Sequence, residues 1–282
     1  AQMLWWIVAI IGTALAITSA LVAEMLFRRR RAAERLTQEV RSLLSEQRSI
    51  AETLQHALLP QQIPEIAGLD LAVRYIPGVD GIDIGGDWYD LIELDERRLF
   101  FVVGDVSGRG VAAGSVMASM LFAIRGFVSE GHGPAAVLDR LTALLDVNRD
   151  QHFATVVCGI ADIDKHEITV ASAGHLPPLL INDRGEFVQV QTGPPIGVRA
   201  GEPYAATTIS VPPRTTLLAY TDGLIERRGE SLDIGLRQLR SCALGSSGRL
   251  EDVLSTIVAE LAPAGSDCFD DDTAILGVRW LG

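Results

Sequence analysis

The stretch RRLFFVVGDV, residues 97–106, joins an unbroken apolar run at 99–103 to the pair Gly104–Asp105. Its Phe and Val side chains, with turn residues directly after them, predict a strand. Aspartate is disfavoured inside strands, so Asp105 predicts the end of this strand and not its middle. The stretch therefore predicts a strand that ends in a carboxylate.

Five further segments have the same character, and helical segments separate them. The strand-like segments are rich in Val, Ile, Thr and aromatic residues and cover residues 69–77, 153–164, 167–175, 215–223 and 273–280. The helical segments cover residues 111–128, 134–148, 234–243 and 250–261. Because the strands group together and the helices come in pairs, we expect an α+β fold with largely antiparallel sheets and helices on the outside.

Composition limits the class of protein. The 282 residues carry a formal net charge of −12, and 48% of them are hydrophobic, which is ample for a core. An acidic chain argues against nucleic acid as a partner, since nucleic-acid-binding proteins usually present a basic face. Cys158, Cys242 and Cys268 form no CxxC pair, so we expect reduced thiols and neither a disulfide framework nor a zinc site.

The first segment is apolar enough to span a membrane. Residues 1–23 carry no charged side chain, Trp5 and Trp6 lie near one end, and four arginines follow at 28–31. About 20 apolar residues suffice to cross a bilayer, and a basic flank stays on the cytoplasmic side. We expect a transmembrane helix over 1–27 of a single-pass cell-membrane protein, with the rest of the chain in the cytoplasm. A buried hairpin helix of a soluble domain is the alternative.

Residues 28–60 predict a helical linker, because they are rich in strong helix formers and contain neither Gly nor Pro before Pro60. A coiled-coil-like heptad seam runs along them, formed by Leu36, Val40, Leu43, Gln47, Ile50 and Leu54. Such a seam predicts a parallel homodimer that relays a signal inward. A plain amphipathic helix packed on its own domain is the alternative, and about three heptads do not decide between them.

Four aspartates stand beside turns. Asp87 follows two glycines in GGDWYD, residues 85–90. Asp105 ends the run at 97–105, Asp222 follows the strand-like residues 215–221, and Asp270 precedes the last strand. For any single one, turn or cap chemistry is a sufficient explanation. Strand ends from one side of an antiparallel sheet can converge, however, and converging carboxylates repel unless a cation lies between them.

Ligands that are all oxygen favour a hard ion such as Mg²⁺ or Mn²⁺. Four carboxylates suit two ions roughly 3.5–4 Å apart, one carboxylate bridging them, which is the arrangement of in-line phosphoryl displacement. Such ions lower the pKa of a water so that it attacks phosphorus near neutral pH without a side-chain nucleophile. The sequence agrees with this chemistry in having no GxSxG elbow and no GxxxxGK[ST] loop.

Six motifs, in their order and spacing, resemble the metal-dependent PPM-type serine phosphatases, and within them the branch of stage II sporulation protein E (SpoIIE) and RsbU. The motifs are GGDWYD at 85–90, GDVSGRG at 104–110, SAGHLPPLL at 172–180, GPPIGV at 193–198, YTDGLIE at 220–226 and DDDTAIL at 270–276. The resemblance covers residues 54–280. It implies an αββα sandwich of two antiparallel sheets flanked by helices, assigned to residues 61–282, and hydrolysis of phosphoserine or phosphothreonine with two Mn²⁺ or Mg²⁺ ions.

Carried over by position, the resemblance implies the metal ligands. Asp87 matches a ligand of one ion. Asp105 matches the bridging ligand, with the carbonyl of Val106 beside it. Asp222 and Asp270 match ligands of the other ion, Asp270 through its place in the DDxT pattern. These four aspartates would act in catalysis through the water that the metals activate.

The sequence departs from the family pattern at two places. The extra acid Asp272 leaves the register of the last motif open, so Asp271 is an alternative ligand. Arg109 stands where many relatives have His or Lys. We interpret it as a solvated loop residue, with contact to the phosphate as the alternative.

The histidines are interpreted as structural or incidental. His175 resembles a catalytic base in type, but a Gly-His-x-Pro turn at a strand end favours a structural role. The other histidines show no metal-pair spacing; they are His56, His132, His152 and His166. Trp88 and Tyr89 are expected in the core or in the wall of the site.

These observations predict a membrane-tethered protein-serine/threonine phosphatase. By resemblance, its substrate is a phosphorylated anti-sigma-factor antagonist of the STAS type in a sigma-factor regulatory pathway. The alternative is a catalytically silent, phosphatase-like binding module that relays a membrane signal. Loss of the ligand carboxylates would be its signature, and all four are present. A nucleotide cyclase is a third alternative, because GGD resembles a cyclase motif, but Trp88 stands where that motif has another acid.

Overall fold

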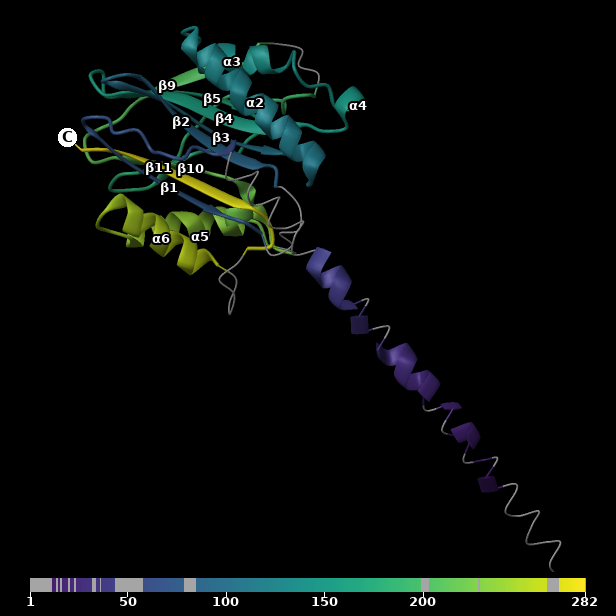
Figure 1. Ribbon diagram of the computed structural model, residues 1–282. Coiled ribbons are helices and arrows are strands. Elements are labelled where there is room, and N and C mark those ends of the chain that lie inside the picture. The colour runs from purple at the N-terminus through teal and green to yellow at the C-terminus, as the bar shows by residue number, and fades with distance from the viewer. Residues whose placement is uncertain are drawn as a thin grey trace, which may run out of the picture. The chain divides into compact units, whose positions relative to one another are not determined.

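The computed structural model (Figure 1) divides the chain into two units, Ala1–Ser49 and Ile50–Gly282. The residues that it describes are 12, 13, 15, 17–19, 21, 22, 24–31, 34, 35, 37–43, 58–78, 85–198, 203–227, 229–262 and 269–281.

The described part of the first unit, between residues 12 and 43, is helical. Ion pairs one turn apart support this helix: Arg28–Glu24 at 2.5 Å and Arg30–Glu34 at 2.9 Å. Of the seam, Val40 and Leu43 are described, and both are exposed. Residues 1–11 and the other members of the seam lie outside the described residues, so the membrane span and the dimer seam stay predictions.

One sheet is built around the strand predicted over residues 97–106. Its order is β2 (Asp87–Asp95), β3 (Arg98–Val106), β4 (Ala154–Asp162) and β5 (Glu167–Ala173), all antiparallel. The short strands β8 (Thr192–Gly193) and β9 (Ala206–Ser210) both pair with β5, β8 in parallel. Residues 99–103 of β3 are fully buried, as a central strand with both faces covered requires.

The other sheet has the order β1 (Leu69–Ile76), β11 (Thr273–Trp280), β10 (Thr216–Tyr220), β6 (Leu179–Ile181) and β7 (Glu186–Phe187). All its neighbours are antiparallel. The last strand of the chain therefore lies between β1 and β10, and nearly all its side chains are buried.

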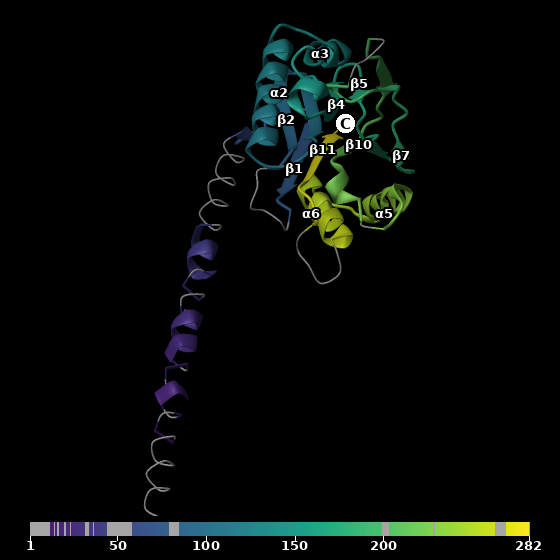
Figure 2. The same ribbon diagram turned by 90° about the vertical axis from the view of Figure 1, so that its right-hand side faces the viewer.

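Helices cover the outer faces of both sheets (Figures 1 and 2). α2 (Val111–Ser129) packs on β2 and β3, and α3 (Pro134–Leu141) packs on β4 and β5. On the other sheet, α6 (Leu250–Leu261) packs on β1 and β11, and α5 (Leu232–Gly245) packs on α6 and β6. The predicted α+β sandwich of two antiparallel sheets flanked by helices is confirmed.

Among the described residues, α2 is the one helix long and apolar enough to cross a membrane by length and composition. Its buried side chains include Met117, Met120 and Ile124, which belong to the same core cluster as Phe100 of β3. The apolar face of α2 is thus explained by the sheet that it covers.

Two local expectations need correction. The predicted helix over 134–148 is two helices, α3 and the short α4 (Val147–Asp150). α4 starts where the Asp146 side chain caps it by accepting from the Asn148 amide at 2.9 Å. The predicted strands leave out residues 87–95, but β2 lies there and begins with the last four residues of GGDWYD. Asp87 therefore stands at the start of a strand, whereas Asp105 stands near the end of one.

Candidate active site

Asp87 and Asp105 lie opposite each other on the neighbouring strands β2 and β3. Gly86 makes a close approach to the end of β3. A Cβ atom on it would lie 2.1 Å from the carbonyl oxygen of Val106 and 2.8 Å from Asp105 Oδ1. The Val106 amide also donates to the Gly86 carbonyl at 3.0 Å. Glycine is required here because any side chain would occupy the space beside these two oxygens.

The glycine before Asp105 is explained by the tryptophan of GGDWYD. A Cβ atom on Gly104 would lie 2.3 Å from a carbon of the Trp88 ring. Trp88 is fully buried and Tyr89 is largely buried, in agreement with the expectation that both lie in the core or in the wall of the site. The indole thus forms an apolar floor under the strand ends that carry Asp87 and Asp105.

The other sheet brings Asp222 to the same place. Asp222 begins the short 3₁₀ helix η1 (Asp222–Leu224) directly after β10. The residue before it, Thr221, is fully buried, and its hydroxyl donates to the Ala274 carbonyl at 3.4 Å. Its oxygen accepts from the Ala274 amide at 2.8 Å. Thr221 therefore joins the end of β10 to the start of β11, and its position beside Asp87 of the opposite sheet lowers the pKa of that carboxyl.

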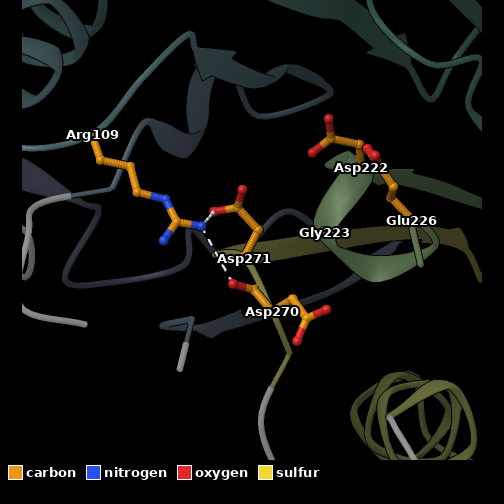
Figure 3. Close-up of a pocket in the computed structure, with 6 residues that line it drawn as sticks. All are labelled: Arg109, Asp222, Gly223, Glu226, Asp270 and Asp271. Carbon is orange, nitrogen blue, oxygen red and sulfur yellow. Dashed lines mark hydrogen bonds and ion pairs between the residues drawn. The ribbon is translucent and has the colours of Figure 1, made fainter. Parts of the chain in front are cut away.

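The three acids of the last motif have different surroundings. The Asp270 side chain is directed away from Arg109 and Asp271, and the Asp270 carbonyl oxygen accepts from Arg109 Nη2 at 3.3 Å (Figure 3). The Asp271 carboxylate lies 2.8 Å from the same Nη2. Asp272 is 9% exposed and accepts from the Gly78 amide at 2.8 Å.

These carboxylates influence one another's ionisation. Burial, and then the charge of Asp105, raises the pKa of Asp87 well above its ordinary value. Burial and then the charge of Asp222 raises the pKa of Asp105 to about 7. Burial is also the main cause that raises the pKa values of Asp222 and Asp272, and in both the charge of Asp271 adds to it. Neighbouring negative charges oppose ionisation, so these five acids form one carboxylate cluster.

Two members of this site were missed in the sequence. The pKa of Tyr75 on β1 is raised by burial and then by the charges of Asp272 and Asp87, which places its hydroxyl beside the carboxylate cluster. Thr221 stands inside the YTDG motif, so its proximity to Asp222 was a usable signal. Tyr75 gave none, because only the pairing of β1 with β11 brings it here.

The residues fit divalent cations. Oδ2 of Asp87 is buried and has no hydrogen-bond partner among the described residues, and a buried carboxylate oxygen is costly unless something pairs with it. The cluster is rich in oxygen donors, with the Val106 carbonyl beside Asp105, and oxygen donors are what Mg²⁺ and Mn²⁺ prefer. As they stand, no three His, Cys, Asp or Glu side chains in the described part lie close enough together to hold an ion. The ligand assignments therefore stay predictions.

A cavity of about 140 Å³ opens beside this cluster. One water needs roughly 10–15 Å³ of such volume, so the cavity has room for a larger group. It is lined by Arg109, Asp222, Gly223, Glu226, Asp270 and Asp271 (Figure 3). Asp222 and Asp271 belong both to the cavity wall and to the carboxylate cluster.

His175 is structural, as the sequence favoured. Its Nε2 donates to the Tyr220 carbonyl at 3.0 Å, and its Nδ1 accepts from the Thr155 hydroxyl at 2.8 Å. Burial lowers the pKa of His175 to about 4, which keeps the ring neutral. Its bond to the last residue of β10 supports the strand that leads to Asp222.

His152 is not incidental. Its Nδ1 lies 2.6 Å from the Ser107 carbonyl, and the Ser107 hydroxyl accepts from the Phe153 amide at 2.9 Å. Together these bonds hold the GDVSGRG loop against the segment before β4. The spacing test for metal pairs missed His152 because its role is a bond to backbone.

Comparison with known proteins places this site in a family. A family model described as Stage II sporulation protein E (SpoIIE) matches residues 95–281. The chain is 26% identical over 199 residues to phosphoserine phosphatase RsbU of Bacillus subtilis (strain 168), covering 70% of this chain and 57% of RsbU. It is 25% identical over 258 residues to protein IcfG of Synechocystis sp., covering 80% and 40%. The chain thus spans about half the length of these relatives.

Solved structures agree with this placement. The RsbU and RsbW domains of Rv1364c from Mycobacterium tuberculosis match with a TM-score of 0.70 and 27% identity, over 79% of this chain and 63% of that one. RsbX in complex with magnesium matches with a TM-score of 0.60 and 20% identity, over 77% and 98%, a likeness of fold alone. Since the family model covers more than half of the chain, the chain belongs to the Stage II sporulation protein E (SpoIIE) family.

Proposed function

We propose that the chain is a metal-dependent protein phosphatase that hydrolyses phosphoserine or phosphothreonine. The observation that carries the proposal is the meeting of carboxylates from both sheets, Asp87 and Asp105 from one and Asp222 from the other, beside a cavity. Membership of the SpoIIE family and the likeness to the phosphoserine phosphatases RsbU and RsbP support the same reaction.

The residues of this chain would divide the work as follows. Asp87, Asp105, Asp222 and the Val106 carbonyl would hold two divalent cations, Mg²⁺ or Mn²⁺. When bound, these ions would supply the charge that stabilises the phosphoryl group in the transition state and activates a water for attack. Thr221, which lies beside Asp87 and lowers the pKa of that carboxyl, would help to keep this ligand in place.

Two neighbouring residues, Asp270 and Asp271, are alternatives for the last metal ligand. The DDxT pattern assigns Asp270, whereas the electrostatics of the cluster favour Asp271, whose charge raises the pKa values of Asp222 and Asp105. Asp270→Asn and Asp271→Asn distinguish them when Mg²⁺ affinity is measured by calorimetry. The variant that loses more affinity identifies the ligand, and equal, unchanged affinity in both would remove this motif from the metal site.

Substrate and location are part of the proposal. Likeness to RsbU and to a protein that joins RsbU and RsbW domains supports a phosphorylated anti-sigma-factor antagonist of the STAS type as substrate. The apolar residues 1–27 and the basic block after them support a single-pass anchor with a cytoplasmic phosphatase domain. The seam in residues 28–60 supports a homodimer that carries a signal to the site.

The direct test is a phosphate-release assay on the full chain with a phosphoserine STAS protein, with Mn²⁺ or Mg²⁺ and with chelator. We expect metal-dependent release that Asp105→Asn abolishes. Asp95→Asn, at the other end of β2, is the matched control and should keep full activity. Activity that survives both chelator and Asp105→Asn would reject the metal mechanism. A folded, metal-binding protein without activity on any phosphoprotein would favour the silent binding module.

A further inference from the structure

Arg109 is held in place by the loop that follows β3. The loop turns through two glycines with positive φ, Gly108 at 89° and Gly110 at 94°, a conformation that glycine adopts without strain. His152 fixes its base through the Ser107 carbonyl. The Arg109 side chain, 36% exposed, therefore projects from an anchored turn and not from an unconstrained loop.

Among the described residues that line the cavity, Arg109 is the one with a cationic side chain. Four of the other five are acids: Asp222, Glu226, Asp270 and Asp271. The guanidinium reaches across the cavity wall to Asp271 Oδ1 at 2.8 Å and to the Asp270 carbonyl at 3.3 Å, both through Nη2 (Figure 3).

A phosphoryl group needs such a cation. A phosphate monoester carries up to two negative charges near neutral pH, and acid-lined walls repel it. Arginine presents a planar fork of donors that matches phosphate oxygens in pairs. Asp271 is 57% exposed, and an ion pair open to water contributes little. A phosphoryl dianion can therefore take the place of the Asp271 carboxylate on the guanidinium.

We propose that Arg109 is the phosphate-binding residue of this chain: it exchanges the Asp271 carboxylate for the phosphoryl group of the substrate. The inference rests on the proposed function and adds to it the group that recognises the phosphate. It replaces the interpretation of Arg109 as a solvated loop residue. Asp271 acts as a placeholder that keeps the guanidinium at the cavity until substrate arrives.

The test compares Arg109→Ala, Arg109→Lys and a matched control, Arg97→Ala. Arg97 also forms an exposed ion pair, with Asp164 at 2.8 Å, and stands just before the other end of β3. Three quantities are measured on the full chain. They are kcat and KM for a phosphoserine peptide, the Kd of inorganic phosphate by calorimetry with Mg²⁺ present, and the Mg²⁺ affinity.

For Arg109→Ala we expect KM and the phosphate Kd to rise about 10- to 100-fold, the range of a charged hydrogen bond. Mg²⁺ affinity and the unfolding midpoint should stay those of the wild type. Arg109→Lys should give KM and phosphate Kd values between those of the wild type and Arg109→Ala, because lysine keeps the positive charge but lacks the planar pair of donors. Arg97→Ala should behave as the wild type in every assay.

Three results would overturn the inference. One is an unchanged phosphate Kd in Arg109→Ala. Another is a loss of Mg²⁺ affinity equal to the loss of phosphate affinity, which would mean that Arg109 only holds residues 270–271 in position. The third is a wild-type protein that binds no phosphate. If the wild type binds phosphate through Arg109 but hydrolyses no phosphoprotein, the proposed function fails while this inference stands.

Discussion

Replacing Asp105 by Asn should stabilise the metal-free protein at neutral pH. Asp105 is partly buried, and most substitutions at such positions destabilise, so the expected sign is unusual. It follows from the carboxylate cluster, in which burial and the charge of Asp222 raise the pKa of Asp105 to about 7 from an ordinary value of 3.8. Folding therefore opposes the ionised form of this carboxylate.

The pH window and size of the effect follow from linkage. Below about pH 3.8 the carboxyl is protonated in both states and changes nothing. Between 3.8 and about 7 the native state keeps a proton that the unfolded state has lost, so the free energy of unfolding falls as pH rises. At about 1.4 kcal/mol per pH unit, the full loss above pH 7 is about 4 kcal/mol. The amide of Asp105→Asn does not ionise and so avoids this loss, but it makes weaker hydrogen bonds than a carboxyl group. We therefore expect a net gain of about 2 kcal/mol in the free energy of unfolding.

The assay is urea unfolding with chelator at pH 5 and pH 8, read by tryptophan fluorescence. Asp105→Asn should exceed the wild type clearly at pH 8 and much less at pH 5. Adding Mg²⁺ should stabilise the wild type and leave the variant nearly unchanged. Asp95→Asn is the control. Because a hydrogen bond from the Arg97 backbone lowers the pKa of Asp95, its replacement should give no gain at pH 8. An Asp105→Asn protein that is less stable than the wild type by the same amount at both pH values would refute the idea of a repelling cluster.

Three further predictions concern the supports of the site. Gly104→Ala should lower the free energy of unfolding in urea by about 2–3 kcal/mol, because the added Cβ would lie 2.3 Å from the Trp88 ring. The control Gly126→Ala, on α2 with open space around it, should raise the free energy of unfolding by up to about 1 kcal/mol. Equal effects of the two substitutions would contradict the packing of Trp88 on Gly104. Burial lowers the pKa of His175 to about 4, so as the pH falls the unfolded chain takes up a proton before the folded protein does. The wild type should therefore lose up to about 3 kcal/mol of stability as the pH falls from 6.5 to 4, and His175→Gln should remove this loss. The same pH dependence of stability in the variant and the wild type would contradict this prediction. Arg227 donates to carbonyls of the η1 turn and of the end of α6. Arg227→Ala should therefore weaken Mg²⁺ binding in calorimetry, and Arg227→Lys should keep part of the affinity. Wild-type Mg²⁺ affinity in Arg227→Ala would mean that Arg227 contributes to stability alone.

Much of the fold was predictable from local patterns. The last strand at 273–280 and the helix at 250–261 have the bounds that the sequence predicted, because alternating or three-four apolar spacing is a property of neighbours along the chain. The resemblance of six motifs also pointed to the layers and to the acids. The glycines before Asp87 and Asp105 were visible, but the reason for them was not: one makes room for the Val106 carbonyl and the other for an indole ring.

The sequence by itself determined the kinds of element, the sandwich class and the set of candidate carboxylates. Only the tertiary structure decided which acid faces which partner: Asp271 toward Arg109, Asp272 toward Gly78, and Asp270 away from both Arg109 and Asp271. Three consecutive aspartates are indistinguishable to any local pattern. Their directions depend on how β11 pairs with β10 and with β1, which comes from the other end of the domain. They also depend on a loop about 160 residues earlier in the chain. Contacts of that range depend on packing between elements, which the spacing of residues along the chain does not encode.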